Sequence, residues 1–164
     1  MASLRVLDIL LETTADGPGF RTSLYFAGCQ HHCAGCHNPQ SWSMEGGEEY
    51  TIDELLEIIK SEPYNVTFSG GDIFFQVGSG IELARRIKEE TDKTLWVYTG
   101  YRIERIQQTR YLARMLPYID VLVDGRYEEG LRDETLPYRG SSNQRIIMVD
   151  KYLKGEKNYE WHLE

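Results

Sequence analysis

The order of predicted elements between residues 51 and 149 constrains the fold of this chain more than any other feature. Short apolar strands alternate there with amphipathic helices. The helices are predicted at 51–60, 79–90 and 102–116, and the strands at 65–68, 94–100, 119–125 and 145–149. Alternation of this kind is typical of an α/β protein in which helices cover a parallel sheet.

Two of the predicted helices start at capping boxes, in which a Ser or Thr is followed three residues later by a Glu. Thr51 pairs in this way with Glu54, and Ser79 pairs with Glu82. The first box is followed by apolar residues at helical spacing, which are Ile52, Leu55, Leu56 and Ile59. We therefore expect one helix to begin at each box.

The remaining segments predict two more strands and two long loops. The strands are expected at 4–12 and 21–28. The segment that starts at Cys29 is rich in Gly, His, Asn and Pro, which favours a loop. A second irregular, polar segment covers 126–144. The length of the chain suggests one domain, and we expect it to span residues 1–164.

Unusual residues follow four of the predicted strands. In parallel α/β folds the reactive groups lie at the carboxyl ends of the strands, so these residues should meet at one edge of the sheet. They are Cys29, Gly70-Gly71-Asp72, Thr99-Gly100 and Asp124-Gly125.

All three cysteines of the chain lie within eight positions, as Cys29-x3-Cys33-x2-Cys36. A structural zinc site fills four positions with protein ligands, so it would need a fourth from His31, His32, His37 or a distant residue. An iron–sulfur cube held by three thiolates instead leaves one iron open to an outside ligand. Buried packing is the third alternative, although the loop around these cysteines is polar.

Charge and hydropathy exclude some classes of function. The chain has 18 Lys and Arg against 26 Asp and Glu, a formal net charge of −8. This balance argues against a general nucleic-acid binder. No apolar run approaches the ~20 residues of a membrane span, and the N-terminal segment is not typical of a signal peptide. We expect a cytoplasmic protein with reduced thiols and no membrane partner.

The spacing of the cysteines resembles the C-x3-C-x2-C motif of the radical S-adenosylmethionine superfamily. Ser69-Gly70-Gly71-Asp72 resembles the Gly-Gly-Glu-Pro motif of that superfamily, with Asp72 and Ile73 in place of the usual Glu and Pro. The stretch "DGPGFRTSLYFAGC" looks like the start of its glycyl-radical-activating branch. Three further stretches resemble the members that activate the anaerobic (class III) ribonucleotide reductase: "CAGCHNPQSW", "VYTGY" and "VDGRYEEGLRDETLPYRGSSNQRII".

This resemblance implies a fold. The superfamily has barrels of βα units, but a full (βα)8 barrel takes ~250 residues. A chain of 164 residues is expected to form a partial, open (βα) barrel of the radical S-adenosylmethionine type, with a mostly parallel sheet. An open barrel leaves one side exposed, which suits a substrate that is itself a protein loop.

The resemblance also implies roles for individual residues. Cys29, Cys33 and Cys36 are expected to bind a [4Fe–4S] cluster whose fourth iron chelates S-adenosylmethionine. The methionine end of that cofactor is expected at Gly70, Gly71 and Asp72, with a hydrogen bond from Thr99. The adenine is expected near Gly35 and His37. His31 and His32 are expected to face outward or to shield the cluster, not to bind it.

The implied activity has two partners. An external one-electron donor reduces the cluster, and a hydrogen atom is taken from a glycine of the anaerobic ribonucleotide reductase large subunit. Residues 139–144 are expected to dock the reductase or to order the site, because long polar loops beside a reactive edge are often functional. The alternatives are a small zinc-binding interaction domain and a radical S-adenosylmethionine enzyme acting on a different glycyl-radical protein or on a small molecule.

Overall fold

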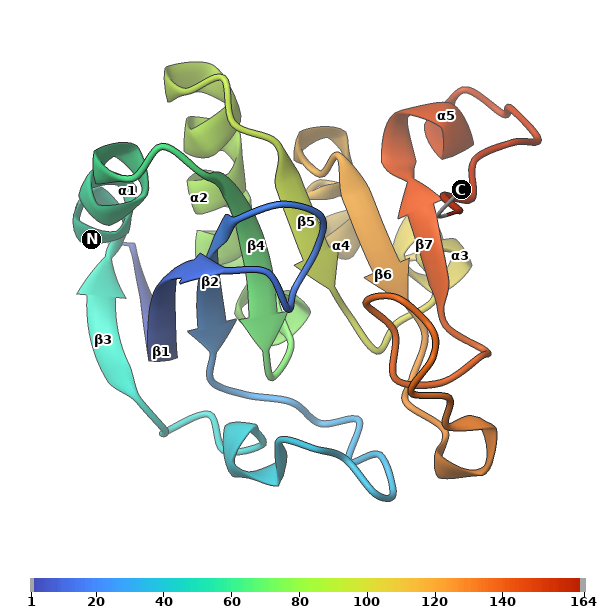
Figure 1. Cartoon of the computed structure of the whole chain (residues 1–164). Coiled ribbons are helices and arrows are strands. Elements are labelled where there is room, and N and C mark those ends of the chain that lie inside the picture. The colour runs from blue at the N-terminus through green and yellow to red at the C-terminus, as the bar shows by residue number, and fades with distance from the viewer. Residues whose placement is uncertain (1, 163–164) are drawn as a thin grey trace.

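The computed structural model describes residues 2–162. Its framework is a seven-stranded sheet of order β3-β1-β2-β4-β5-β6-β7 (Figure 1). The strands are β1 (Ser3–Thr13), β2 (Arg21–Phe26), β3 (Glu48–Thr51), β4 (Asn65–Gly70), β5 (Leu95–Tyr98), β6 (Val121–Asp124) and β7 (Arg145–Met148). Because the sheet begins at β3 and ends at β7 without pairing them, it is open.

The centre of the sheet is parallel and its two ends are antiparallel. Strands β2, β4, β5 and β6 pair in parallel, whereas β1 is antiparallel to both of its neighbours and β7 is antiparallel to β6. Crossover helices connect the parallel strands from β4 onward, as parallel pairing requires. The prediction of a partial, open (βα) barrel with a mostly parallel sheet is confirmed.

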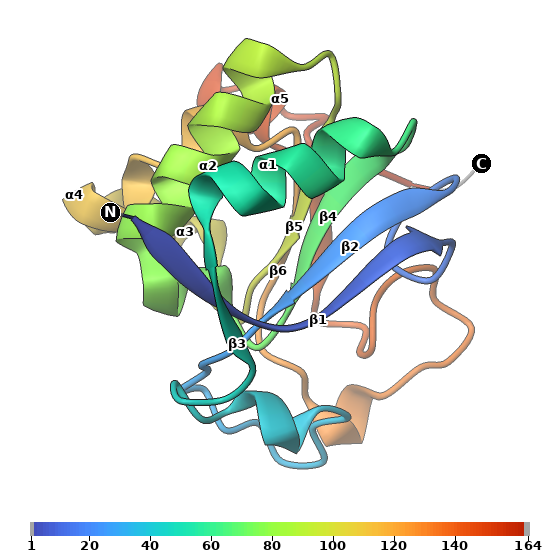
Figure 2. The same cartoon turned by 90° about the vertical axis from the view of Figure 1, so that its left-hand side faces the viewer.

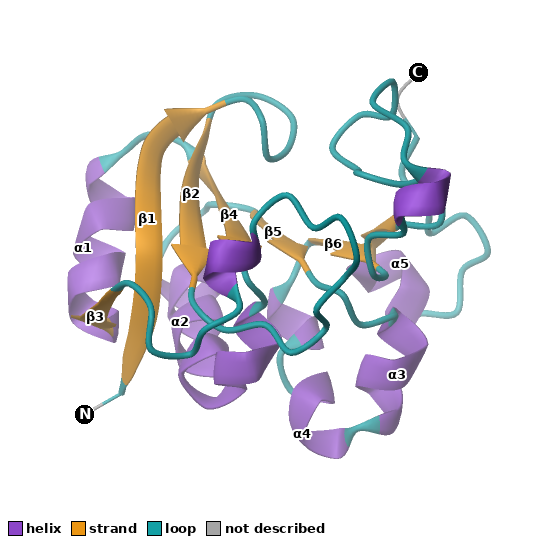
Figure 3. Cartoon of the chain, turned by 90° about the horizontal axis from the view of Figure 1, so that it is seen from below, coloured by secondary structure: helices purple, strands orange, loops and turns teal. Residues whose placement is uncertain are grey.

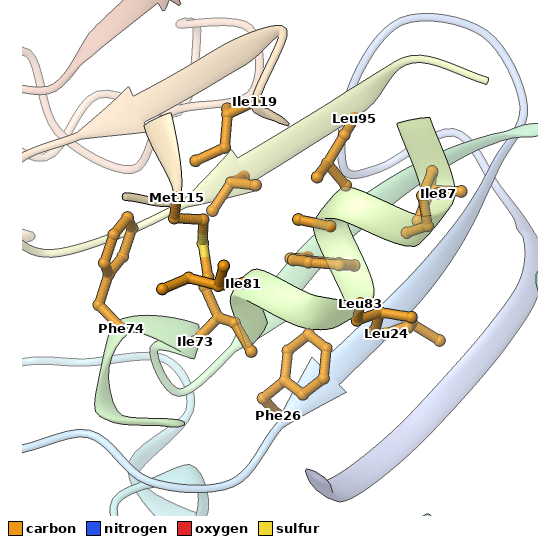
Figure 4. Packing of buried hydrophobic residues seen from close by; sticks show 14 of the residues in the cluster. Leu24, Phe26, Ile73, Phe74, Ile81, Leu83, Ile87, Leu95, Met115 and Ile119 are labelled. Carbon is orange, nitrogen blue, oxygen red and sulfur yellow. The ribbon is translucent and has the colours of Figure 1, made fainter. Parts of the chain in front are cut away.

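The helices gather on one face of the sheet (Figure 2). They are α1 (Ile52–Ser61), α2 (Val77–Glu90), α3 (Ile103–Gln108), α4 (Arg110–Ala113) and α5 (Val149–Leu153). Helix α2 lies at the centre of the main hydrophobic core, where Ile81, Leu83 and Ile87 pack with residues of the central strands (Figure 4). Burial of each such side chain stabilises the fold by about 1.5–3 kcal/mol.

One of the two predicted capping boxes forms. The Thr51 side chain accepts a hydrogen bond from the Glu54 backbone N–H, and the Glu54 side chain accepts one from Thr51, so α1 begins as expected. The predicted start at Ser79 is wrong. A short 3-10 helix, Ile73–Gln76, runs directly into α2, so Ser79 lies inside the helix and not at its cap.

The predicted helix at 102–116 is interrupted. Thr109 adopts an extended backbone conformation between α3 and α4. Its hydroxyl donates a hydrogen bond to the Arg105 carbonyl, a local contact that competes with regular helix geometry. Strand β3 and helix α5 were not predicted. The outer strand β3 is polar and lacks the apolar pattern by which strands are recognised.

The parallel strands all end at the same edge of the sheet. In Figure 1 the arrowheads of β2, β4, β5 and β6 point to the lower edge, where the long loops gather. Viewed from below, these loops cross in front of the sheet (Figure 3). Within residues 2–162, no helix has the length and apolar character needed to cross a membrane.

Candidate functional site

A cavity of about 250 Å³ lies at this edge of the sheet, enclosed by the two long loops. Seven of the nine predicted site residues line it: Cys29, Cys33, Cys36, His37, Gly70, Gly71 and Thr99. Gly35 and Asp72 are near but do not line it. The edge therefore collects most of the predicted residues in one place.

The loop that carries the cysteines is closed at its base by backbone hydrogen bonds. The Gly28 N–H donates to the Ser41 carbonyl at 2.7 Å, and the Cys29 N–H donates to the Trp42 carbonyl at 3.2 Å. Gly28 has a φ of +99°, a left-handed conformation that favours glycine. These contacts place Cys29 directly after β2, at the wall of the cavity.

The three thiols are free and half-buried. Burial raises the pKa of the Cys29 thiol to about 11 and also raises the pKa of Cys33. Thiolate ligation of a metal centre must therefore displace protons from these groups. Among residues 2–162, no three His, Cys, Asp or Glu side chains converge on a position suited to a single metal ion.

The two glycines after β4 are required by close backbone packing. Gly70 has a φ of +94°, and a Cβ there would lie 2.4 Å from the Phe26 nitrogen. A Cβ on Gly71 would lie 2.5 Å from the Gly28 carbonyl oxygen, at the base of the cysteine loop. The glycines thus bring the turn after β4 against the cysteine loop and leave their own backbone facing the cavity.

The carboxylate of Asp72 is only 1% exposed and does not line the cavity. Its Oδ2 accepts hydrogen bonds from the Thr99 hydroxyl at 2.7 Å and from the Gly100 N–H at 2.9 Å. Its Oδ1 accepts one from the Phe74 N–H at 3.0 Å. A cofactor that contacts Asp72 directly would have to reach a carboxylate that is buried among these donors, so the predicted contact remains a prediction.

The two histidines in the middle of the cysteine loop differ. His32 is exposed and stacks on Trp42 with ring centroids 4.4 Å apart. His31 does not face outward, because its side chain is 3% exposed and its Nε2 lies 2.9 Å from Asp72 Oδ2. The sequence offered no signal for this difference, since both residues stand in the same polar stretch.

The end of the cysteine loop meets the 126–144 loop. The His37 ring lies 5.1 Å from the Tyr127 ring, centroid to centroid. Gly35 has a φ of +72°, and a Cβ there would lie 2.6 Å from the Glu129 carboxyl carbon. These contacts close the cavity between two segments that are almost 100 residues apart in the chain.

The segment 139–144 forms part of the cavity wall through Gly140 and Gln144. The Gln144 side chain accepts from the Gly140 N–H at 2.8 Å and donates to the Gly125 carbonyl at 3.0 Å. Arg139 donates to the Gln144 carbonyl at 3.2 Å. The geometry agrees with an ordering role for this segment, whereas docking of a partner stays a prediction.

Two larger cavities adjoin the one that the cysteines line. One, of about 590 Å³, shares Gly100 and Gly125 with it and is lined by Arg102, Arg105 and Arg126. The other, of about 660 Å³, shares His37, Asn38, Ser69 and Gly70 with it and is lined by Asp8 and Asp16. The edge therefore has room for a larger ligand than the central cavity alone could hold.

The residues present fit an iron–sulfur cluster. Three reduced cysteines face one cavity, and thiolates are the usual protein ligands of such clusters. Two glycine backbones and the Thr99 side chain face the same space, so a further ligand of the cluster would meet polar groups there.

Comparisons with known proteins agree with this chemistry. The family described as a 4Fe-4S single cluster domain matches residues 15–147. Among curated proteins, the chain is 36% identical over 146 residues to the anaerobic ribonucleoside-triphosphate reductase-activating protein of Pasteurella multocida, covering 84% of this chain and 92% of that protein. The proteins of the same name from Enterobacteria phage T4 and Escherichia coli K12 are 37% and 33% identical, each over 80% of this chain and over 85% and 90% of their own lengths.

A solved structure supports the fold. The crystal structure of QueE from Escherichia coli superposes with a TM-score of 0.51 at 15% sequence identity. The match covers 60% of this chain and 52% of that protein. At this level of identity the similarity extends to the arrangement of strands and helices.

Proposed function

Because the chain belongs to the 4Fe-4S single cluster domain family, and within it to the anaerobic ribonucleoside-triphosphate reductase-activating proteins, we propose that it is a radical S-adenosylmethionine activase. Its substrate on this proposal is a glycine of the anaerobic ribonucleotide reductase large subunit, and its electron comes from an external donor. The observation that carries the proposal is the single cavity shared by Cys29, Cys33, Cys36, Gly70 and Thr99.

The cysteine loop supplies the ligands for the [4Fe–4S] cluster. Cys29, Cys33 and Cys36 line one cavity and would hold the cluster through three thiolates. The closed base of the loop at Ser41 and Trp42 fixes where Cys29 stands relative to β2.

The turn after β4 and the end of β5 orient S-adenosylmethionine. The backbones of Gly70 and Gly71 and the Thr99 side chain face the cavity, where the methionine end would lie. Gly35 and His37, at the other end of the cysteine loop, stand where the adenine is expected. The 126–144 loop covers this side and excludes water through Tyr127 and Gln144.

A [4Fe–4S] cluster held by Cys29, Cys33 and Cys36 would supply the one-electron reductive cleavage of S-adenosylmethionine, with the electron coming from the external donor and the hydrogen atom from the substrate glycine. The protein's part is positioning. The open edge next to the two larger cavities gives a loop of the reductase access to the site.

The decisive experiment is anaerobic iron–sulfur reconstitution followed by low-temperature EPR of the reduced protein. A [4Fe–4S]⁺ signal that changes on addition of S-adenosylmethionine would support the proposal. A colourless protein that holds one zinc per chain, or a cluster indifferent to S-adenosylmethionine, would contradict it.

The partner is tested separately. Addition of the reductase large subunit to the reduced, S-adenosylmethionine-bound protein should give a glycyl-radical signal and one equivalent of 5′-deoxyadenosine. Cleavage of S-adenosylmethionine without a radical on the reductase would keep the enzyme class and reject this partner. The Cys33→Ser variant is the matched negative control, since it removes one cluster ligand and keeps the size of the side chain.

A further inference from the structure

The side chain of His31 is buried at the apex of the cysteine loop, residues 30–37. Its side chain is 3% exposed, although the residues next to it, Gln30 and His32, are exposed. The ring packs edge-on against Phe75 and Tyr101, with centroids 5.2 and 4.7 Å away. A polar ring placed in this way needs partners for both nitrogens.

Both ring nitrogens have partners. Arg126 Nε donates to His31 Nδ1 at 3.2 Å, which assigns the imidazole proton to Nε2. The Nε2–H then donates to Asp72 Oδ2 at 2.9 Å. The histidine therefore joins two side chains that come from two other strand ends.

Asp72 extends this connection to a third strand end. The same Oδ2 atom accepts hydrogen bonds from the Thr99 hydroxyl and from the Gly100 N–H, which follow β5. Asp72 itself follows β4, and Arg126 follows β6. One imidazole thus ties the cysteine loop to the carboxyl ends of three neighbouring parallel strands.

The backbone around His31 is shaped to admit the ring. A Cβ on Gly100 would lie 2.4 Å from His31 Cδ2 and 2.7 Å from Nε2. The glycine has no left-handed φ that would require it there. Its missing side chain is therefore explained by the space that the imidazole occupies.

The loop apex is attached to the rest of the chain through side chains. Among the described residues, no backbone–backbone hydrogen bond joins residues 30–37 to any part of the chain outside the cysteine loop. The backbone bonds at Gly28 and Cys29 fix only the base of the loop. Cys33 follows His31 by two residues in the loop apex, so its position depends on side-chain contacts.

We propose that His31 is a positioning residue that holds the cysteine loop, through Asp72, at a set distance from Gly70, Gly71 and Thr99. On this view the buried carboxylate that follows the two glycines acts through the protein and not by touching the cofactor. The inference rests on the proposed function, because the distance it sets is that between the cluster and the methionine end of S-adenosylmethionine.

The first test compares three variants of the full chain after anaerobic reconstitution. His31→Phe keeps the ring that packs on Phe75 and Tyr101 but removes the donor to Asp72. His31→Gln places an amide N–H near the position of Nε2 and should rescue. His32→Asn is the matched control, because Asn tolerates the positive φ of 49° at that residue.

We measure iron content, melting temperature, and the concentration of S-adenosylmethionine that half-converts the EPR signal. His31→Phe should keep its cluster but need at least about tenfold more S-adenosylmethionine, as for residues that orient metal ligands. His31→Gln and His32→Asn should stay within about threefold of the wild-type concentration. That change is smaller than the one expected when an orienting contact is lost. His31→Phe protein with the wild-type response would overturn the proposal, whatever its melting temperature.

A second test displaces the ring without changing it. Gly100→Ala pushes a Cβ into the His31 ring, whereas Gly130→Ala meets nothing within 4 Å. Neither glycine has a left-handed φ, so neither substitution strains the backbone, and only Gly100→Ala meets another side chain. Gly100→Ala should raise the S-adenosylmethionine concentration that half-converts the EPR signal, as His31→Phe does, and Gly130→Ala should leave it unchanged. Equal responses from the two variants would contradict the proposal.

A third test needs no cluster and so separates this proposal from the proposed function. ¹⁵N NMR of the cluster-free full chain should show a proton on His31 Nε2. The destabilisation by His31→Phe and Asp72→Ala should be less than additive in a double-mutant cycle, because both remove one contact. An unprotonated Nε2 or strict additivity would reject the tie even if the activase chemistry is established.

Discussion

Two buried carboxylates, Asp72 and Asp124, stand at the ends of parallel strands but have different kinds of partner. Asp124, 0% exposed, accepts two hydrogen bonds from Arg145, at 3.0 Å to Oδ1 and 2.6 Å to Oδ2. It also accepts one from the Ile103 N–H at 2.8 Å, where α3 begins. Asp72 has no arginine or lysine partner within the described residues, and its donors are a hydroxyl, an imidazole and backbone N–H groups.

The difference separates a structural role from a role in the site. The partners of Asp124 belong to β7 and α3, which are parts of the framework. Burial disfavours the charged form of Arg145, but hydrogen bonds to Asp124 and Glu104 outweigh it and raise the pKa of Arg145. Three of the four partners of Asp72 line the cavity that the cysteines share, and they are His31, Thr99 and Gly100. Removal of Asp124 should therefore cost stability, and removal of Asp72 should mainly disturb the site.

The largest loss of stability is expected for Asp124→Ala. The variant removes the buried carboxylate partner of Arg145, whose side chain is 14% exposed, and leaves only the partly exposed Glu104. Breaking such a pair should lower the free energy of unfolding by about 3–5 kcal/mol. Urea unfolding of the cluster-free full chain measures this. A loss below about 1 kcal/mol, the range of exposed pairs, would show that Asp124 is not the structural member of the comparison.

A smaller loss is expected for Asp72→Ala, because its partners are uncharged in the assigned tautomer. Leaving buried donors such as the Gly100 N–H unpaired should lower the free energy of unfolding by about 1–3 kcal/mol. In the reconstituted protein the same variant should need more S-adenosylmethionine for its EPR change, whereas the folded fraction of Asp124→Ala should not. If both variants need the same concentration of S-adenosylmethionine, the assignment of a structural role to Asp124 and of a role in the site to Asp72 is wrong.

Thr99→Val sharpens the comparison with a nearly isosteric change. It removes the hydroxyl that donates to Asp72 at 2.7 Å and accepts from the Tyr101 N–H at 3.1 Å. The expected cost in the free energy of unfolding is about 1 kcal/mol for the hydrogen bonds. The matched control is Thr109→Val, whose hydroxyl bonds only to a helix carbonyl at the surface. An equal loss in the free energy of unfolding of the two variants would mean that the hydrogen bond from Thr99 to Asp72 adds no stability.

The smallest effect is expected at Glu104, the partly exposed second partner of Arg145. The hydrogen bond from Arg145 at 2.7 Å lowers the pKa of Glu104 below its ordinary value. A lowered pKa in the folded state means that Glu104 stabilises the fold at neutral pH and loses this contribution as the pH falls through the folded-state pKa. Because the side chain is 45% exposed, Glu104→Gln should cost less than about 1 kcal/mol at pH 7.

Unfolding of Glu104→Gln and of the wild type at pH 7 and at pH 3 measures that contribution. The difference between them should shrink at the lower pH. A difference that grows as the pH falls would have the wrong sign for a carboxylate with a lowered pKa.

Much of the fold followed from local pattern. The alternation of apolar strands and amphipathic helices predicted the parallel centre of the sheet, and Thr51 with Glu54 predicted the start of α1. Ser79 did not start α2, because the turn closed by Asp72 leads into the helix earlier. The start of a helix depends on the preceding turn, and that turn is fixed by long-range contacts of the aspartate.

The candidate site shows the same limit. The sequence placed Cys29, Gly70 and Thr99 at one edge, because parallel strands end together. It could not show that His31 turns inward while His32 turns outward, since the two share one environment in the chain.

The sequence by itself therefore determined the order of the parallel strands and their crossover helices, the spacing of the three cysteines and the edge at which they lie. Only the tertiary structure decided which side chains face the cavity and which hold the loops behind it. The reason is the separation of the partners along the chain. Asp72 lies 41 residues from His31 and 27 from Thr99, and Arg126 lies 95 from His31. Contacts over such separations form only when neighbouring strand ends have been brought together by the sheet.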